Sequence, residues 1–348
     1  MDWQVQSIVL VTEIAAGMIF FRLLIPFFRR VKTGRFDLYI GDRFKKDGSE
    51  PKFAGVVMLI TAALGLTSGL IGRGVKGGLE IAGQLNITAV LGCGAVVLVI
   101  TALGIAQDYH DQTKRGTGLK TRWVILIEFV VCLGFSFLAE FSGVIGTKLL
   151  LPFHMGNIEL GFTFYPLTAA LMLGIINLVE LHDCPGGVTD YGCDGLCGAT
   201  VMMFSLACAG ACALYPWAEL PQILSVVTMG CCAAYLYWGF SPSKMYLGRS
   251  GSKFLGTMVA LITVTTDLPL MFLSGGIVFI ADGVCTLLGF LVFKHKKQLL
   301  FKGLTLHGHL KNRGWGEYKI IGTSAIATLL GATGVFMYII YANGILLN

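Results

Sequence analysis

The stretch HDCPGGVTDYGCDGLCGA, residues 182–199, concentrates residue types that do chemistry. It holds one histidine, three aspartates and three cysteines among five glycines, and long apolar runs lie on both sides of it. His182 could form a zinc site with Cys184, Cys193 and Cys197, but their spacing matches no compact pair of zinc ligands. We favour the other interpretation, in which the stretch belongs to a site for a charged, water-soluble ligand.

Three pairs of polar residues lie at or near the ends of the apolar runs, at a spacing that would place both members on one face of a helix. Carboxylates near a helix end inside a membrane are costly unless a cation or a metal ion offsets their charge. Each pair alone is typical of a solvated helix end, but their convergence favours a functional site. The pairs are Asp108 with Asp111, Asn177 with Glu180, and Asp190 with Asp194.

The elements that must position these residues are the apolar runs. The chain of 348 residues is 55% apolar and 13% charged, with a mean hydropathy of +0.75, which excludes an ordinary soluble protein. Runs of about 18 residues or more are long enough to cross a bilayer as helices. We therefore expect one all-α domain over residues 1–348 with about ten transmembrane helices. The runs are 6–26, 53–72, 86–106, 123–142, 161–181, 195–215, 221–240, 254–273, 275–293 and 320–341.

The basic residues predict the orientation, because Lys and Arg stay on the cytoplasmic side during insertion. The loops after the odd-numbered runs hold 22 of the 26 Lys and Arg residues. Both termini should therefore lie outside, and the net charge of +6 is a signal of topology and not of nucleic-acid binding. The cytoplasmic loops are expected near 27–52, 107–122, 182–194, 241–253 and 294–319.

These loops resemble, in order and position, those of the MraY family of phospho-N-acetylmuramoyl-pentapeptide-transferases. KKDGSEPKFAG at 45–55 is similar to KKAGTPTMGG, QDY at 107–109 to the DDY of an Asp-Asp motif, and NLVE followed by VTDYGCDGL at 188–196 to NxxNLTDGLDGL. SPSKMYLGRSGS at 241–252 looks like NPAKVFMGDVGS, and LHGHLKNRGWGE at 306–317 looks like PLHHHFELKGWPE. The resemblance covers nearly the whole chain, and its last motif separates the muramoyl branch from the GlcNAc-1-phosphate relatives.

The resemblance implies a multi-pass protein of the bacterial inner membrane, with a cytoplasmic active face, that acts in cell-wall synthesis. It would transfer phospho-MurNAc-pentapeptide, or a related phospho-sugar, from a UDP carrier to undecaprenyl phosphate. Its partners would be a UDP-linked amino sugar, a polyprenyl phosphate and the lipid bilayer, its cofactor in the family is magnesium, and a homodimer is compatible with it. The residues it places in catalysis are Asp108, Asp190, Asp194, His307 and His309, and those it places at the substrate are Asn177, Lys114, Gly248, Arg249, Gly251, Trp315 and Glu317.

The chain departs from the family pattern at residues on which the chemistry depends. Gln107 replaces the first aspartate of the Asp-Asp motif and Asp111 replaces its lysine, while Glu180 replaces the second asparagine of NxxN. Gly308 replaces the middle histidine of the triplet, and Arg249 replaces the magnesium-binding aspartate. An arginine in a ligand position repels a metal ion, so we expect magnesium to bind poorly.

Two functions stay open. The first is a transferase, either with a shifted metal site or with Arg249 as a substitute for the metal ion. In the second form, the guanidinium of Arg249 sits among Asp108, Asp190 and Asp194, replaces the charge of the ion and contacts the diphosphate. The second is a catalytically silenced paralogue that binds a lipid phosphate or a UDP-sugar, or that partners another membrane protein. In that case Arg249 belongs to an inert cluster of ion pairs.

Overall fold

Long helices make up almost all of the described chain. The structure is a computed structural model and describes residues 3–30, 51–82, 86–113, 119–150, 157–183, 193–214, 218–266, 271–296 and 305–346. The long helices are α1 (Trp3–Arg30), α2 (Ala54–Ala82), α3 (Ile87–Thr113), α4 (Thr121–Phe141), α5 (Phe164–Asp183), α6 (Leu196–Ala213), α7 (Glu219–Gly239), α8 (Gly248–Thr265), α10 (Ile277–Lys296) and α12 (Glu317–Leu346). The short elements are β1 (Lys148–Leu150), β2 (Asn157–Glu159), the 3-10 turn η1 (Gly161–Thr163), α9 (Met271–Gly275) and α11 (Leu306–Asn312).

The apolar runs of the sequence coincide with these long helices, and seven of the helices are long and apolar enough to cross a membrane. The all-helical class and the membrane character are therefore confirmed. The seven segments are Trp3–Arg30, Ala54–Gly72, Ile87–His110, Thr121–Phe141, Gly161–Asp183, Leu196–Ala213 and Glu219–Gly239.

The helix α8 lies in the middle of the bundle, where it packs against α2, α3, α5 and α7. Every residue of α8 except Arg249 is buried. A helix that is covered by protein on all sides need not be apolar toward lipid, so it can carry charged residues if they are paired. This placement makes α8 the element around which polar groups of neighbouring helices can gather.

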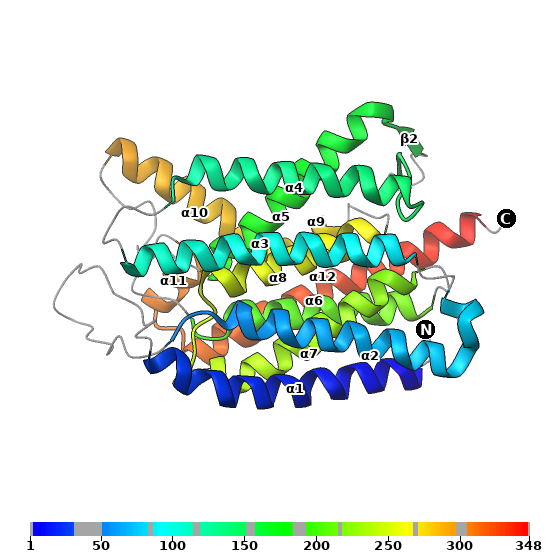
Figure 1. The fold of residues 1–348 in the computed structure, drawn as a ribbon. Coiled ribbons are helices and arrows are strands. Elements are labelled where there is room, and N and C mark those ends of the chain that lie inside the picture. Colours follow the sequence, from blue (N-terminus) through cyan, green and yellow to red (C-terminus); the bar gives the residue numbers. More distant parts are fainter. Residues whose placement is uncertain are drawn as a thin grey trace.

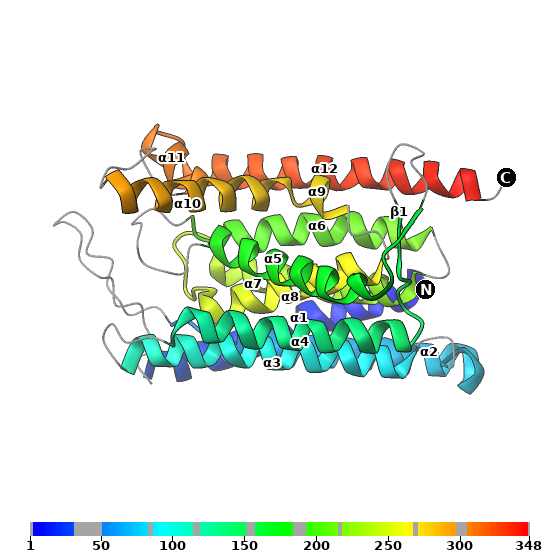
Figure 2. The ribbon, with the colours of Figure 1, turned by 90° about the horizontal axis from the view of Figure 1, so that it is seen from above.

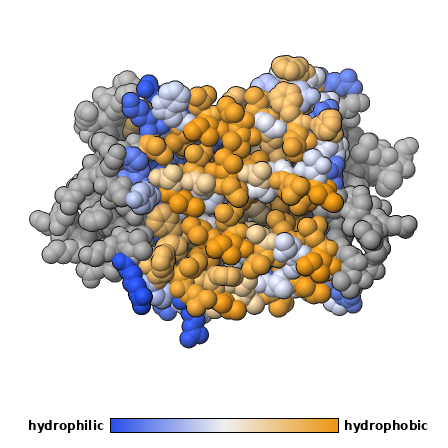
Figure 3. Space-filling view, viewed as in Figure 1, coloured by the Kyte–Doolittle hydropathy of each residue, from blue (hydrophilic) through white to orange (hydrophobic). Residues whose placement is uncertain are grey.

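The two ends of the bundle differ from its middle. Figure 3 shows an apolar band across the visible face, with hydrophilic residues toward both ends of the bundle. Figure 1 places the N- and C-termini together at one end, while α11 and the C-terminal ends of α1, α3 and α10 lie at the opposite end. Seen from above, α3 and α4 lie on one side of the bundle, and α10 and α12 lie on the other (Figure 2).

Several element boundaries differ from those expected. Residues 107–113 continue α3, and α8 begins at Gly248 within the segment expected to be a loop. The reason is a side-chain contact described below, in which α3 supplies the cap of α8. The strands β1 and β2 also form a two-stranded antiparallel hairpin, with Lys148 opposite Glu159, which the apolar pattern did not predict.

Candidate functional site

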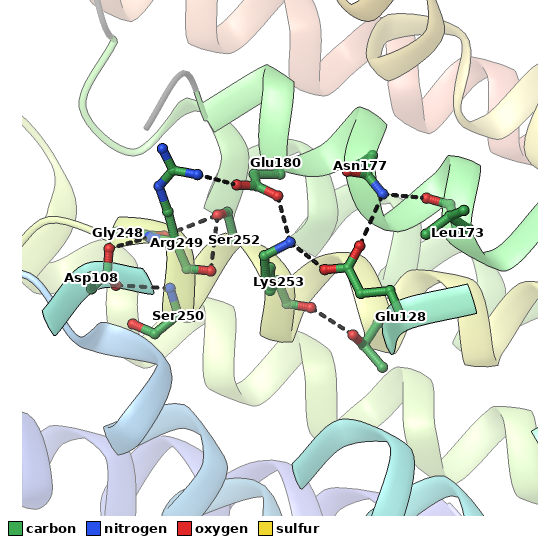
Figure 4. Close-up of polar contacts among 11 residues, drawn as sticks. Asp108, Glu128, Leu173, Asn177, Glu180, Gly248, Arg249, Ser250, Ser252 and Lys253 are labelled. Carbon is green, nitrogen blue, oxygen red and sulfur yellow. Dashed lines mark hydrogen bonds and ion pairs between the residues drawn. The ribbon is translucent and has the colours of Figure 1, made fainter. Parts of the chain in front are cut away.

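Asp108, near the end of α3, holds the start of α8. Asp108 is 2% exposed, its Oδ1 accepts the backbone N–H of Arg249 at 3.0 Å, and its Oδ2 accepts that of Ser250 at 2.9 Å. The first N–H groups of a helix have no partner within the helix, and a negative charge beside them is favoured by the helix dipole. Asp108 therefore caps α8 from a neighbouring helix, and both of its oxygens are engaged (Figure 4).

Glycines allow the start of α8 to approach α2 and α3 closely. A Cβ at Gly104 of α3 would lie 2.7 Å from the carbonyl oxygen of Arg249, and a Cβ at Gly55 of α2 would lie 2.4 Å from that of Ser250. Gly248 has φ +68°, and a Cβ there would lie 2.9 Å from Oδ2 of Asp108. Larger residues would therefore push the two neighbouring helices away from the cap.

The guanidinium of Arg249 contacts Glu180 of α5. Its Nη1 atom lies 3.4 Å from Oε1 of Glu180, and the arginine side chain is 28% exposed. One of the two interpretations above placed this guanidinium among Asp108, Asp190 and Asp194, and the other placed it in a cluster of ion pairs. The contact of Asp108 is instead with the backbone of Arg249, because the two oxygens of Asp108 cap α8. Arg249 thus lies in the candidate site, but with a carboxylate partner that the sequence did not predict.

Lys253, four residues after Arg249 on α8, is a second cation at this place. Its side chain is 1% exposed, and its Nζ atom lies 2.7 Å from Oε2 of Glu180. The same Nζ atom donates to Oε1 of Glu128, which comes from α4 and is fully buried. We call Arg249, Glu180, Lys253 and Glu128 the α8 ion network. In this network two cations pair with two carboxylates, and the four residues come from three helices (Figure 4).

Asn177 extends this network along α5. Its Nδ2 group donates to Oε2 of Glu128 at 3.3 Å and to the carbonyl of Leu173 at 2.8 Å. Asn177 and Glu180, three residues apart on α5, thus both join the α8 ion network, Asn177 through Glu128 and Glu180 through Lys253 (Figure 4). The sequence analysis missed Lys253 and Glu128. The signal that could have found them is a charge beside or within an apolar run, which is costly without a partner.

The aspartates of the stretch at 182–199 are described only in part. Asp190 and Lys114 lie outside the described residues. Asp194 lies in the turn before α6, and its Oδ2 accepts the hydroxyl of Ser243 at 2.9 Å. The spacing from Asp190 had suggested that Asp194 lies on a helix, and the structure places it in a turn instead.

Two further predicted residues, Trp315 and Glu317, lie where α12 begins. The ammonium of Lys319 lies 4.3 Å from the centroid of the Trp315 ring, and that of Lys311 lies 2.5 Å from Oε1 of Glu317. A lysine side chain thus contacts each of these two residues.

The predicted residue Gly251 is buried within α8.

His307 contacts Asp282 of α10, which the sequence analysis did not select. Nδ1 of His307 and Nδ1 of His182 each lie 2.7 Å from Oδ2 of Asp282. His309, two residues further on α11, is partly exposed. His182 therefore lies beside Asp282 and His307, and not in the cysteine set considered above.

The cysteine part of that zinc hypothesis finds no support. Cys184 lies outside the described residues, and Cys197 donates to the carbonyl of Val179 at 3.8 Å. Burial raises the pKa of the Cys193 thiol to about 12, as is typical of an unreactive buried cysteine.

The donors around position 249 do not suit magnesium. Magnesium prefers oxygen ligands in a near-ideal octahedron, including one or two carboxylates. Here position 249 is an arginine, both oxygens of Asp108 accept N–H groups, and Glu180 and Glu128 accept from Lys253. Two side-chain cations, paired with two carboxylates, therefore lie at and near position 249.

Comparison with known proteins gives the family of the chain. The sequence model of glycosyl transferase family 4 matches residues 90–267, just over half of the chain. A phospho-N-acetylmuramoyl-pentapeptide-transferase of Caldanaerobacter subterraneus subsp. tengcongensis is 26% identical over 331 residues, covering 94% of this chain and 96% of that protein. Proteins with the same name from Geobacillus sp. (strain WCH70) and Bacillus subtilis (strain 168) are each 26% identical, covering 96% and 90% of this chain and 98% and 92% of their own length. The chain is an integral membrane protein that belongs to glycosyl transferase family 4, and its similarity to these MraY proteins extends over most of its length.

Proposed function

We propose that the chain is a phospho-sugar transferase of peptidoglycan synthesis that acts without a bound magnesium ion. An oxygen of a polyprenyl phosphate would attack the phosphorus atom next to the sugar of a UDP-linked amino sugar. A new P–O bond to the lipid phosphate forms, the bond between the two phosphates of the carrier breaks, and UMP leaves. The attacking oxygen is already ionised at neutral pH, so the step needs charge neutralisation and alignment more than it needs a base.

The observation that carries this proposal is the position of Arg249. Its guanidinium is partly exposed, whereas the rest of α8 is buried, and Glu180 holds it on one side. Arginine recognises phosphate through several parallel hydrogen bonds and stays charged at all relevant pH values. We therefore assign it the role of neutralising the diphosphate. Lys253 supports that role, because it also binds Glu180, so that this carboxylate is not bound by Arg249 alone.

A second candidate is binding without transfer, and the environment of Asp108 favours it. Both carboxylate oxygens of Asp108 are engaged by backbone N–H groups in a buried position. A carboxylate used in this way is a poor metal ligand. In this reading the chain binds a lipid phosphate or a UDP-sugar on the scaffold of the family.

The deciding experiment uses the purified full chain in detergent with undecaprenyl phosphate and UDP-MurNAc-pentapeptide. UMP release is followed with magnesium and with EDTA, and binding of the UDP-sugar is measured in parallel. Release that persists in EDTA supports the transferase without magnesium. Binding without release supports the second candidate. Release that stops in EDTA and returns with Mg²⁺ but not with Zn²⁺ contradicts the charge substitution.

For the arrangement in the membrane, we infer ten spans with both termini outside and the site on the cytoplasmic face. The distribution of basic residues supports this. The shared end of the two termini in Figure 1, opposite to α11, is consistent with an even number of spans. The helices α8, α10 and α12 would be the three spans beyond the seven apolar ones. The proposal also includes a homodimer. It keeps the roles that the family resemblance gives to Asp190, Lys114, His307 and His309.

A further inference from the structure

A cluster of two histidines and an aspartate joins three helices away from the α8 ion network. His182 lies in the last turn of α5, Asp282 lies in α10 and His307 lies in α11. They are 2%, 1% and 3% exposed, and one potential ligand atom from each lies within 4.8 Å of the others. We call these three residues the His182 cluster.

The imidazole groups are aimed at one carboxylate. Nδ1 of His182 and Nδ1 of His307 both lie 2.7 Å from Oδ2 of Asp282, and the other carboxylate oxygen accepts the backbone N–H of Leu306 at 2.7 Å. Nε2 of His182 is buried and has no hydrogen-bond partner among the described residues. The polar contact of this ring is therefore directed into the cluster.

The donor set is typical of zinc and not of magnesium. Zinc takes neutral imidazole nitrogens and carboxylate oxygens in tetrahedral sites, whereas magnesium prefers oxygen ligands alone. A divalent cation would offset the charge of the buried Asp282 carboxylate. The Leu306 N–H holds the second oxygen of Asp282, as outer hydrogen bonds orient carboxylate ligands in metal sites.

We propose that His182, Asp282 and His307 form a binding site for Zn²⁺ or a similar transition-metal ion that ties α11 to α5 and α10. The proposal does not depend on the proposed transferase activity, because it concerns a structural cross-link. It has a consequence for the neighbouring region. Two residues before His182, α5 carries Glu180 of the α8 ion network, so the metal ion fixes the helix end that positions this carboxylate.

The competing explanation is a hydrogen-bonded clamp, in which both imidazole N–H groups donate to Asp282 and no metal binds. Both explanations predict that Asp282→Asn destabilises the protein. They differ in metal content, and in whether a chelator and added zinc change the stability of the unmodified chain.

The test uses the full chain without a histidine tag, purified in detergent without chelator, and elemental analysis by mass spectrometry. We expect about one zinc ion per chain, a lower melting temperature after chelation, and recovery with Zn²⁺ but not with Mg²⁺. After replacement by Co²⁺, the visible absorption bands of a tetrahedral nitrogen and oxygen site should appear.

The variants His182→Gln and His307→Gln should each lose the metal ion and the response to Zn²⁺. The matched control is His309→Gln, which lies on the same short helix as His307 and should keep the metal content. If the unmodified chain holds no metal ion and Zn²⁺ leaves its melting temperature unchanged after chelation, the cluster is a hydrogen-bonded clamp and the metal site is refuted. Loss of metal in His309→Gln would also contradict the assigned ligand set.

Discussion

The carboxylate of Asp108 accepts the backbone N–H of Arg249 at 3.0 Å. Asp108 matches the motif that the chain resembles, whereas Arg249 departs from it. The contact lies between the end of α3 and the start of α8. It fixes the backbone at the altered position and leaves the guanidinium to contact Glu180. Asp108 thus fixes the start of α8, and the side chain of Arg249 gives this start a positive charge.

The first prediction concerns this cap. Asp108→Ala removes the acceptor of two N–H groups beside buried residues, and should lower the stability by about 2 kcal/mol or more. Asp108→Asn retains one carbonyl oxygen and should lose less. The measurement is the melting temperature in detergent. Equal losses in the two variants would mean that the negative charge, and not the acceptor, holds α8.

A second prediction concerns Lys253. Lys253→Met leaves Glu180 and the fully buried Glu128 without their ammonium partner, and breaking a buried ion pair in this way costs about 3 to 5 kcal/mol. Adding Glu128→Gln should recover part of the loss, because one uncompensated charge is removed. The exposed lysine Lys244 provides the control, and Lys244→Met should change the melting temperature little.

If the effects of Lys253→Met and Glu128→Gln are additive in a double-mutant cycle, the two residues do not interact in the folded protein. A coupling of the expected sign would instead establish that α4 and α8 are joined through this pair. The cycle is informative because neither residue belongs to the motifs that revealed the family.

The helices could be predicted from the sequence and the ion partners could not. The length of an apolar run can be read directly from the sequence and predicts a helix long enough to cross a membrane, so the long helices fall on the predicted runs. It does not report which runs are neighbours. Glu128 and Lys253 lie 125 residues apart, and His182 and Asp282 lie 100 apart, so their contacts depend on how the helices pack.

The motifs selected residues that the structure brings together, since Arg249, Asn177 and Glu180 belong to one network of contacts beside α8. They failed for the partner of Arg249, because the spacing of residues within one loop carries no information on the cap that α3 supplies. The same limit explains the missed hairpin β1–β2, which is formed by two strands too short to show an alternating pattern.

Arg249 itself should matter more for binding than for stability. Its side chain is 28% exposed and lies 3.4 Å from Glu180, and partly exposed pairs contribute less than about 1 kcal/mol. Arg249→Ala should therefore change the melting temperature slightly but weaken the binding of the UDP-sugar roughly 10-fold to 100-fold, as expected for a lost charged hydrogen bond. Arg122→Ala, at an exposed arginine on α4, is the control. A large loss of stability with unchanged binding would assign Arg249 to a purely structural cluster.

The orientation can be checked with reporter fusions. Fusions after Arg35, Lys114, Lys244 and Lys311 should report a cytoplasmic position, and a fusion near Lys148 should report an external one, because the basic residues gather in the odd-numbered loops. Lys244 is chosen because it precedes α8, whereas Lys253 lies inside that helix. A cytoplasmic signal near Lys148 would be incompatible with ten spans.

The last prediction is the response to magnesium. In the unmodified chain Mg²⁺ should change neither the melting temperature nor the affinity for the UDP-sugar, because cations of the α8 ion network occupy the region. Gln107→Asp with Arg249→Asp restores two carboxylates, but the ammonium of Lys253 would still repel the ion four residues away. We therefore expect magnesium dependence only when Lys253→Met is added together with Glu128→Gln, which removes the fully buried carboxylate and leaves Glu180 without its two cationic partners and open to the ion. Isothermal titration with Mg²⁺ compares the double and the quadruple variant. Strong magnesium dependence of the unmodified chain would overturn the view that side-chain cations have replaced the metal ion.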